Sequence, residues 1–314
     1  MNIIEYLRKE VISDLFQVNS FNNNWNTLWK AQINDKIFIN GQVCAQSILD
    51  LGDDLGEIFK NARSAGRTQS GVSAAGTTWE GLICWYLNFC LINTNVVVIK
   101  QKKANMPNPI SDALTVMYGA SPSNTEADLI AVVFPNTAEY SSDITQLSRL
   151  PIFTDIPLFR RNNIFKYKEA LNELVSRDSN DIQINVIQCK TNWNDNAQIP
   201  MLWDMVYNAQ GFQRNNISVG VNNYSLNSFN RFSYSFVTVP TTNRAKIKST
   251  SVAVKRVCTL SGGNYWGYPT SNNIASSIKD IFNRNFSAGI IPNIRTSLTN
   301  ALPDINTEFS YFNL

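Results

Sequence analysis

Three residues at the ends of two predicted strands carry side chains that could act together on a phosphate ester. Asp128 begins the apolar run ADLIAVVF, and the later run INVIQCK ends with Gln188 and Lys190 two positions apart. A spacing of two places both side chains on one face of a strand. If the two strands are neighbours, Asp128 joins them, and the site holds a carboxylate, an amide oxygen and an ammonium group.

These groups suit the hydrolysis of a phosphodiester around a magnesium ion. Mg²⁺ takes oxygen ligands and keeps several waters, one of which can become the nucleophile. The cation and the Lys190 ammonium would both offset the negative charge that develops on phosphorus. A plainer interpretation stays open, in which Lys190 marks the strand end and reaches solvent while Gln188 caps a neighbouring backbone group.

The absence of histidine narrows the chemistry further. The chain has 314 residues, with 27 Lys and Arg, 24 Asp and Glu, a net charge of +3 and no His. Ser-His-Asp and Cys-His nucleophile systems, HExxH zinc proteases and general base catalysis by His are therefore excluded for this chain acting alone. Carboxylates, lysine and a metal ion remain as the means of hydrolysis.

The elements that must position these residues follow a mixed α/β pattern. Helical spacing of apolar residues predicts helices, and short runs rich in Val and Ile predict strands. We expect helices over residues 3–17, 43–60, 77–91, 164–177, 199–209 and 274–286, and strands over 96–99, 127–134, 182–189, 217–221, 229–239 and 246–258.

The motif residues resemble those of a known family of nucleases. Asp128 followed by Gln188-Cys189-Lys190 is similar to the D…(D/E)xK signature of the PD-(D/E)XK superfamily, and its surroundings resemble type II restriction endonucleases. Glu80, in TTWEGLICWYLN, resembles the acidic residue that this superfamily carries on a helix packed against its sheet. Two departures are that Ala127, not proline, precedes Asp128, and that Gln188 replaces an acidic residue.

The resemblance covers roughly residues 77–210 and implies a fold, a cofactor and partners. The fold would be a mixed central β-sheet flanked by helices, with Mg²⁺ as the cofactor. Asp128 would bridge the metal, the Cys189 carbonyl and the Gln188 amide oxygen would be further ligands, and Lys190 would orient or help deprotonate the attacking water. The substrate would be double-stranded DNA cut at a short specific site by a homodimer. A cognate DNA methyltransferase would belong to the same system. Two alternatives are a repair or recombination nuclease of the same fold and, from another functional class, a DNA-binding protein whose nuclease site has decayed.

No repeat or shift in composition divides the chain, so we expect one domain. It would have a helical N-terminal part (about 1–76), a catalytic core (about 77–210) and a C-terminal part with additional strands that contacts DNA (about 211–314).

The role of Glu80 has two interpretations that can both hold. Thr77-x-x-Glu80 matches a capping box, in which Glu80 would serve the helix N-terminus, or Glu80 could complete the metal site. Glu126 could share the face of Asp128 and is the first substitute for Glu80, and Asp112 and Glu139 are further acids near the same strand.

Basic and polar residues outside the motif are candidates for DNA contact. Alternating basic residues at 244–248 would form one row on a strand, which suits a phosphate backbone, although a solvated edge strand is the alternative. Arginines in the stretch 63–76 could pair with guanine edges, or the stretch could be a plain loop. The candidates are Arg63, Arg67, Lys102, Lys103, Asn192, Asn194, Arg244, Lys246 and Lys248.

The remaining features predict a protein of the cytoplasm that does not associate with membranes. No apolar run is long enough to cross a bilayer, and the N-terminus lacks the apolar segment of a signal peptide. The five cysteines are scattered without a CxxC pair, so buried, reduced thiols are expected.

Overall fold

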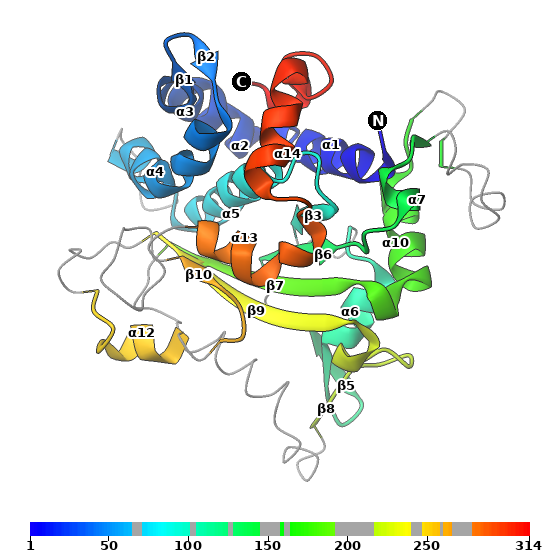
Figure 1. The fold of residues 1–314 in the computed structure, drawn as a ribbon. Helices are drawn as coiled ribbons and strands as arrows, with labels where there is room; N and C mark the ends of the chain where they lie inside the picture. The colour runs from blue at the N-terminus through cyan, green and yellow to red at the C-terminus, as the bar shows by residue number, and fades with distance from the viewer. Residues whose placement is uncertain are drawn as a thin grey trace.

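A five-stranded sheet with helices packed around it forms the centre of the molecule (Figure 1). The computed structural model describes residues 1–64, 71–100, 105–124, 128–144, 158–159, 164–191, 217–239, 247–257, 260–265 and 278–314. The predicted class, α/β with a mixed central sheet flanked by helices, is confirmed.

The central sheet has the strand order β10-β9-β7-β6-β3. The strands are β3 (Val96–Lys100), β6 (Leu129–Val133), β7 (Gln183–Lys190), β9 (Arg231–Thr238) and β10 (Asn264–Tyr265). β6 pairs antiparallel with both of its neighbours, β3 and β7, whereas β7, β9 and β10 run parallel to one another. Every residue of β6 is buried, which explains why its sequence is a continuous apolar run.

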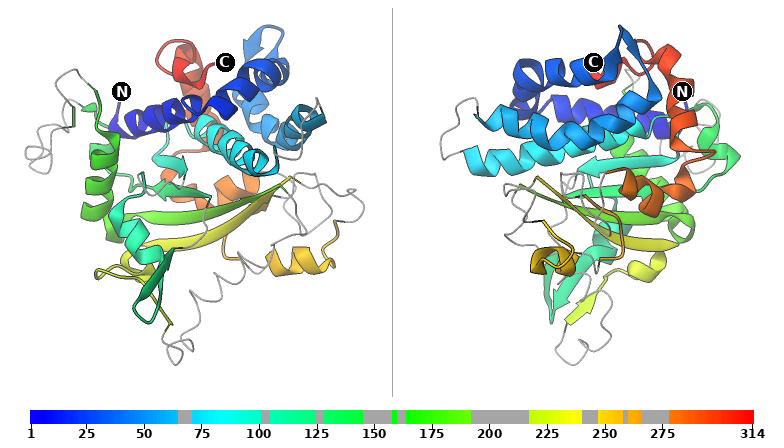
Figure 2. Two further views of the ribbon diagram at one scale, coloured as in Figure 1. Left: turned by 180° about the vertical axis from the view of Figure 1, so that it is seen from behind. Right: turned by 60° about the vertical axis from the view of Figure 1, so that its left-hand side comes forward.

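Helices from the first third of the chain form a layer over one side of this sheet (Figure 2). They contribute four tryptophans to the core, Trp25, Trp29, Trp79 and Trp85, all of them fully buried. The elements of this part are α1 (Ile3–Phe16), α2 (Asn19–Asn24), a π-helix (Trp25–Trp29), α3 (Lys30–Ile37), β1 (Phe38–Ile39), β2 (Gln42–Val43), α4 (Ala45–Ser64) and α5 (Gly71–Cys90).

Smaller elements surround the rest of the sheet. A second sheet, of order β5-β4-β8, extends away from the N-terminal helices (Figure 1). The elements are α6 (Asn108–Leu114), β4 (Thr115–Tyr118), β5 (Ser121–Asn124), α7 (Ala138–Ser141), α10 (Tyr167–Arg177), β8 (Ile217–Val219), α12 (Val252–Val257), α13 (Lys279–Asn285) and α14 (Ile294–Ala301), with short 3₁₀ turns at Ser179–Asp181, Leu226–Ser228, Ser287–Gly289, Leu302–Asp304 and Ser310–Phe312.

One prediction about the C-terminal part is wrong. Residues 246–258 were expected to form a strand because they are rich in Val and Ile, but Val252–Val257 is the helix α12. Ser251 precedes this helix and accepts a hydrogen bond from the Lys255 amide through its carbonyl (2.9 Å). Strand propensity is a weak preference that the local context overrides here. The helix expected over 199–209 lies outside the described residues.

Hydrophobic packing links the beginning of the chain to its end. One cluster of buried residues runs from Ile3 to Phe312. The carbonyls of Phe312 and Asn313 accept hydrogen bonds from the indoles of Trp85 and Trp25, each at 3.1 Å. The boundary expected near residue 76 lies inside α5, so the N-terminal part and the core share a helix.

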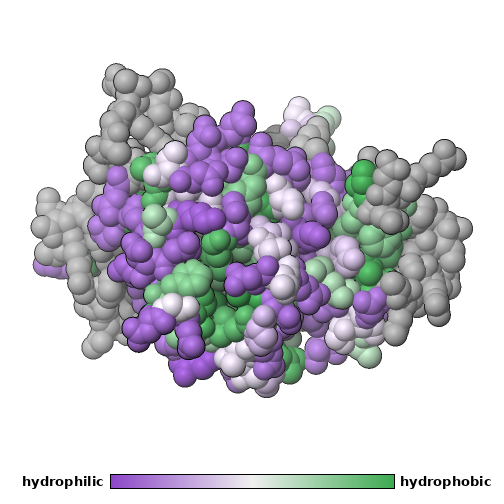
Figure 3. Space-filling view, turned by 90° about the horizontal axis from the view of Figure 1, so that it is seen from above, coloured by the Kyte–Doolittle hydropathy of each residue, from purple (hydrophilic) through white to green (hydrophobic). Residues whose placement is uncertain are grey.

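The surface over the N-terminal helices is dominated by hydrophilic side chains, with hydrophobic side chains in small areas between them (Figure 3). Among the described residues, no helix is both long enough and apolar enough to cross a membrane. Cys84, Cys90 and Cys189 are buried free thiols as expected, while Cys44 is exposed and Cys258 lies outside the described residues.

A buried asparagine fixes α5 against β3. The side chain of Asn88 is fully buried, and its amide group donates to the carbonyls of Cys84 (3.0 Å) and Val98 (2.7 Å). Its oxygen accepts a hydrogen bond from the Val98 amide (3.1 Å). Asn88, a polar residue in an apolar helix, therefore joins α5 to the backbone of the edge strand β3.

We expect Asn88→Leu to lower the free energy of unfolding by about 2–4 kcal/mol, because the Val98 peptide group would lose its partners inside the core. Urea unfolding of the variant against wild type measures this. Asn300, an exposed residue of α14, provides the matched control, since Asn300→Leu should change stability by less than about 0.5 kcal/mol. Equal effects of the two substitutions would contradict the role assigned to Asn88.

Candidate functional site

The register of the sheet brings the ends of three strands to one place. Lys100, the last residue of β3, pairs with Leu129, the first residue of β6, and Leu129 pairs with Ile187 of β7. Asp128, immediately before β6, therefore lies beside the end of β7 that carries the Gln-Cys-Lys motif. The condition set for a joint site, that the two motif strands are neighbours, is met.

Two hydrogen bonds from β7 hold the Asp128 carboxylate. The side-chain amide of Gln188 donates to Oδ2 at 2.8 Å, and the backbone amide of Cys189 donates to the same oxygen at 2.6 Å. Asp128 thus has a fixed position relative to the strand that carries Lys190. Neither partner is charged, so these bonds orient the carboxylate without neutralising it.

The protonation of Asp128 is shifted by its surroundings. Burial and the charge of the Glu80 carboxylate raise the pKa of Asp128 from its ordinary value of 3.8 to about 7. The Lys190 ammonium, the hydrogen bond from the Cys189 amide and the Lys100 ammonium act in the opposite direction. A cation close to the carboxylate would favour its ionised form further.

Gln188 is fixed on both sides of its amide. The side chain is fully buried, and its oxygen accepts a hydrogen bond from the Tyr234 hydroxyl of β9 at 2.9 Å. Its NH₂ group therefore faces Asp128, and its oxygen faces Tyr234. In this arrangement Gln188 orients Asp128. A half-turn of the amide would direct the oxygen toward Asp128 while the Tyr234 hydroxyl accepted from the NH₂ group.

The strand pairing also directs the Cys189 carbonyl. The Val239 amide donates to the Lys190 carbonyl at 3.0 Å, so Lys190 directs its peptide groups toward β9. Successive residues of a strand alternate in this respect. Cys189 therefore directs its peptide groups toward β6, where its N–H meets Asp128, and its carbonyl points to the same side, beyond the start of β6.

Glu80 reaches this end of the sheet from α5, but it does not form a capping box. α5 begins at Gly71, so Thr77 lies inside the helix and that interpretation is wrong. Glu80 instead forms an ion pair with Lys100, with 3.3 Å between Oε2 and Nζ. Lys100 also donates to the Thr77 carbonyl at 3.1 Å.

Lys100 and Thr238 are residues of this site that sequence reasoning missed. Lys100 stands at the start of a run of three lysines, and nothing in the sequence sets it apart from the other two. Thr238 pairs with Lys190 across β7 and β9, and its side chain is fully buried. Its hydroxyl has no hydrogen-bond partner among the residues that the structure describes. A threonine in a strand is common, so no sequence signal distinguished this one.

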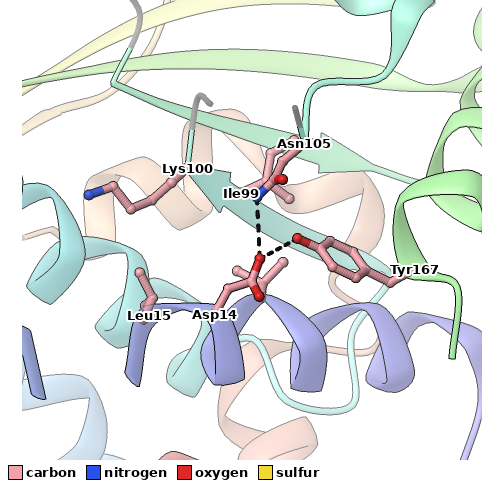
Figure 4. A pocket seen from close by; sticks show the side chains of 7 residues that line it. Asp14, Leu15, Ile99, Lys100, Asn105 and Tyr167 are labelled. Carbon is pink, nitrogen blue, oxygen red and sulfur yellow. Dashed lines mark hydrogen bonds between the residues drawn. The ribbon is translucent and has the colours of Figure 1, made fainter. Parts of the chain in front are cut away.

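A small cavity borders the site on the other side of Lys100 (Figure 4). Its volume is about 20 Å³, which suits about one water molecule. Asp14 lines it and accepts hydrogen bonds from the Tyr167 hydroxyl and from the Asn105 amide, the latter at 3.3 Å. The Lys100 side chain points away from Asp14, Asn105 and Tyr167 (Figure 4), and its ammonium forms the ion pair with Glu80.

The other acids considered for the site lie elsewhere. Glu139 follows the far end of β6 and forms an ion pair with Arg177 at 2.6 Å. Asp112 is in α6 and accepts a hydrogen bond from Asn222 at 3.1 Å. Glu126 lies outside the described residues.

Most of the proposed DNA contacts fall outside what the structure describes. Lys248 is exposed, but it precedes a turn and α12, so the expected basic strand does not extend through it. The backbone of Arg63 belongs to α4. The remaining candidates, Arg67, Lys102, Lys103, Asn192, Asn194, Arg244 and Lys246, lie outside the described residues.

No family model matches the chain. Comparison with curated proteins also finds no match.

The donor set at Asp128 fits a hard divalent cation. Within the described part of the chain, no three His, Cys, Asp or Glu side chains form a group that could hold a metal ion. Mg²⁺ does not need such a group, because it is often bound through one or two carboxylates and keeps waters as its other ligands. The Asp128 carboxylate and the Cys189 carbonyl would hold it, whereas the Gln188 oxygen, predicted as a further ligand, faces Tyr234 and not Asp128.

Proposed function

We propose that the chain is a Mg²⁺-dependent type II restriction endonuclease that cleaves double-stranded DNA at a short specific sequence. The observation that carries this proposal is the position of the Asp128 carboxylate at the end of the sheet. Gln188 and Cys189 hold it there, and they belong to the strand that ends in Lys190. A carboxylate near a lysine, at the ends of neighbouring strands, corresponds to the first and last residues of the PD-(D/E)XK signature, whose middle acidic residue is Gln188 here.

The chain's own residues would each have a separate task. Asp128 would bind the cation, which supplies positive charge against the charge that develops on phosphorus. Lys190 would orient the attacking water and help to remove its proton. Gln188 and the Cys189 amide would keep Asp128 in place, and Tyr234 would keep Gln188 in place.

The proposal extends to the assembly and its setting. Both strands of DNA must be cut, so a homodimer with two-fold symmetry matches a palindromic site. The products would carry 5′-phosphate and 3′-hydroxyl ends. A DNA methyltransferase of the same specificity would protect the host, and the protein would act in the cytoplasm.

A DNA-binding protein with a decayed nuclease site is a second candidate. The orientation of Gln188 favours it, because the amide oxygen faces Tyr234 and the NH₂ group faces Asp128. An amide donor beside the carboxylate replaces the acidic residue that would attract a cation.

Incubation of the purified chain with plasmid DNA and Mg²⁺ tests the proposal. We expect discrete fragments with Mg²⁺ and intact plasmid with EDTA. Cutting at ends or junctions would favour a repair or recombination nuclease. A gel shift without cleavage in either Mg²⁺ or Mn²⁺ would contradict the proposal and favour the decayed site.

A further inference from the structure

The ion pair between Glu80 and Lys100 lies beside the proposed metal site, near enough for both charges to act on Asp128. Their side chains are 20% and 11% exposed, respectively, and the two atoms are 3.3 Å apart. Lys100 has a second partner in the Thr77 carbonyl of the same helix. Its ammonium is therefore held between β3 and α5, close to the end of β6 where Asp128 lies.

The ion pair changes the charge balance of the site. Asp128 and Glu80 carry negative charge, whereas Lys100 and Lys190 carry positive charge. The four charges sum to zero when all are ionised. Glu80 therefore has its counter-charge within the protein, and Asp128 is the carboxylate whose two hydrogen-bond donors from β7 are both neutral.

We propose that the Lys100 ammonium occupies the position beside Glu80 that a second divalent cation would otherwise take. The site then binds one cation, at Asp128, and Glu80 does not ligate it. Glu80 is a positioning residue for Lys100. This inference rests on the proposed function, because it assumes that a divalent cation binds at Asp128.

Displacement of Lys100 by a metal would be costly. The ammonium is mostly buried, and loss of Glu80 would leave it without its counter-charge. The cavity next to its stem offers no replacement, because the side chain points away from the Asp14 carboxylate there (Figure 4). A cation at Glu80 would also lie close to an ammonium of like charge.

Isothermal titration calorimetry with Mn²⁺ in the absence of DNA tests this inference in the full chain. Mn²⁺ takes the same oxygen ligands as Mg²⁺. We expect wild type to bind one Mn²⁺. Lys100→Met should bind its first Mn²⁺ about tenfold more tightly, because a like charge is removed, and should bind a second Mn²⁺ at the released Glu80. Glu80→Gln should bind one Mn²⁺ about tenfold more weakly, because the charge of Lys100 is no longer offset.

The double variant Glu80→Gln/Lys100→Met separates the two possible roles of Glu80. If the charges of Glu80 and Lys100 offset each other and neither residue binds the cation, the double variant should bind its first Mn²⁺ within about threefold of wild type. Lys100→Arg keeps the charge and should behave like wild type. Thermal unfolding followed by circular dichroism shows that each variant is folded before titration.

Four results would overturn the inference. The double variant could bind as weakly as Glu80→Gln or more weakly, which would make Glu80 a direct ligand. Lys100→Met could bind no more tightly than wild type, or wild type could bind two ions. An absence of Mn²⁺ binding by folded wild type would overturn the proposed metal-dependent function as well, whereas the other results leave that function standing.

Discussion

Asp128→Asn is expected to make the protein more stable above pH 7 in EDTA, while abolishing DNA cleavage. The folded chain binds a proton at Asp128 with a pKa of about 7, against an ordinary value of 3.8. Between these values the folded state holds more protons than the unfolded state, so stability falls as pH rises. An asparagine oxygen can still accept from Gln188 and the Cys189 amide, but it carries no charge to bury.

The expected gain is about 2–4 kcal/mol at pH 8, because one pKa unit corresponds to about 1.4 kcal/mol. It should disappear near pH 4, where wild-type Asp128 is protonated in the folded state. Mg²⁺ should reduce the gain by stabilising wild type through binding. Urea unfolding at pH 4, 6 and 8 measures these differences.

Asp35 is an exposed residue of α3 and provides the control for this substitution. Asp35→Asn should change stability by less than about 0.5 kcal/mol at each pH. If Asp128→Asn were destabilising at pH 8, or had the same effect at pH 4 and pH 8, the raised pKa assigned to the partly buried Asp128 carboxylate would be contradicted.

Lys190→Met is expected to lower the rate of cleavage about 10³-fold, since a positioned group that orients and deprotonates the nucleophile contributes roughly 10²–10⁴-fold. Methionine keeps most of the length of the side chain and removes its charge. DNA affinity should change by less than about fivefold, because one charge contributes little to a large interface. Single-turnover cleavage and a binding titration in Ca²⁺ measure the two effects separately.

Lys9, an exposed lysine of α1, provides the matched control. Lys9→Met should cut at a rate within about twofold of wild type, as expected for a change at a surface position. A Lys190→Met protein that binds DNA and keeps most of its cleavage rate would remove Lys190 from the proposed chemistry.

The sequence was sufficient to predict the two strands of the site, although not that they pair with each other. The continuous apolar run of β6 and the Ile and Val residues of β7 indicated buried strands, and their ends carry Asp128 and the Gln-Cys-Lys motif. Buried strands have a strong sequence signal because every position must be apolar. The polar residues at their ends are therefore conspicuous.

Contacts between distant segments were not predictable in the same way. Tyr234 reaches Gln188 from a strand 46 residues away, and its hydroxyl decides which end of the amide faces Asp128. Lys100 was one lysine in a basic run until the register placed it beside the start of β6. The capping box was wrong because α5 begins earlier, in a polar stretch where the apolar pattern is absent.

The helices between residues 19 and 37 were not predicted, because this segment is rich in polar residues. Phe21, Trp25, Trp29, Ile33 and Ile37 are spaced four apart and are all buried. This is a helical pattern, but the asparagines between its members resemble a loop. The aromatic residues of this segment pack on α5, where the Trp25 and Trp85 rings lie 4.6 Å apart, so tertiary packing stabilises a sequence with weak helix propensity.

Cleavage of plasmid DNA by wild type and Asp128→Asn, prepared side by side, tests the central claim most directly. With Mg²⁺, wild type should yield discrete fragments with 5′-phosphate ends, and Asp128→Asn should leave the plasmid intact while remaining folded and still binding DNA. Cleavage by Asp128→Asn at the wild-type rate, or an intact plasmid with both proteins, would contradict the claim that Asp128 holds the cation of a nuclease.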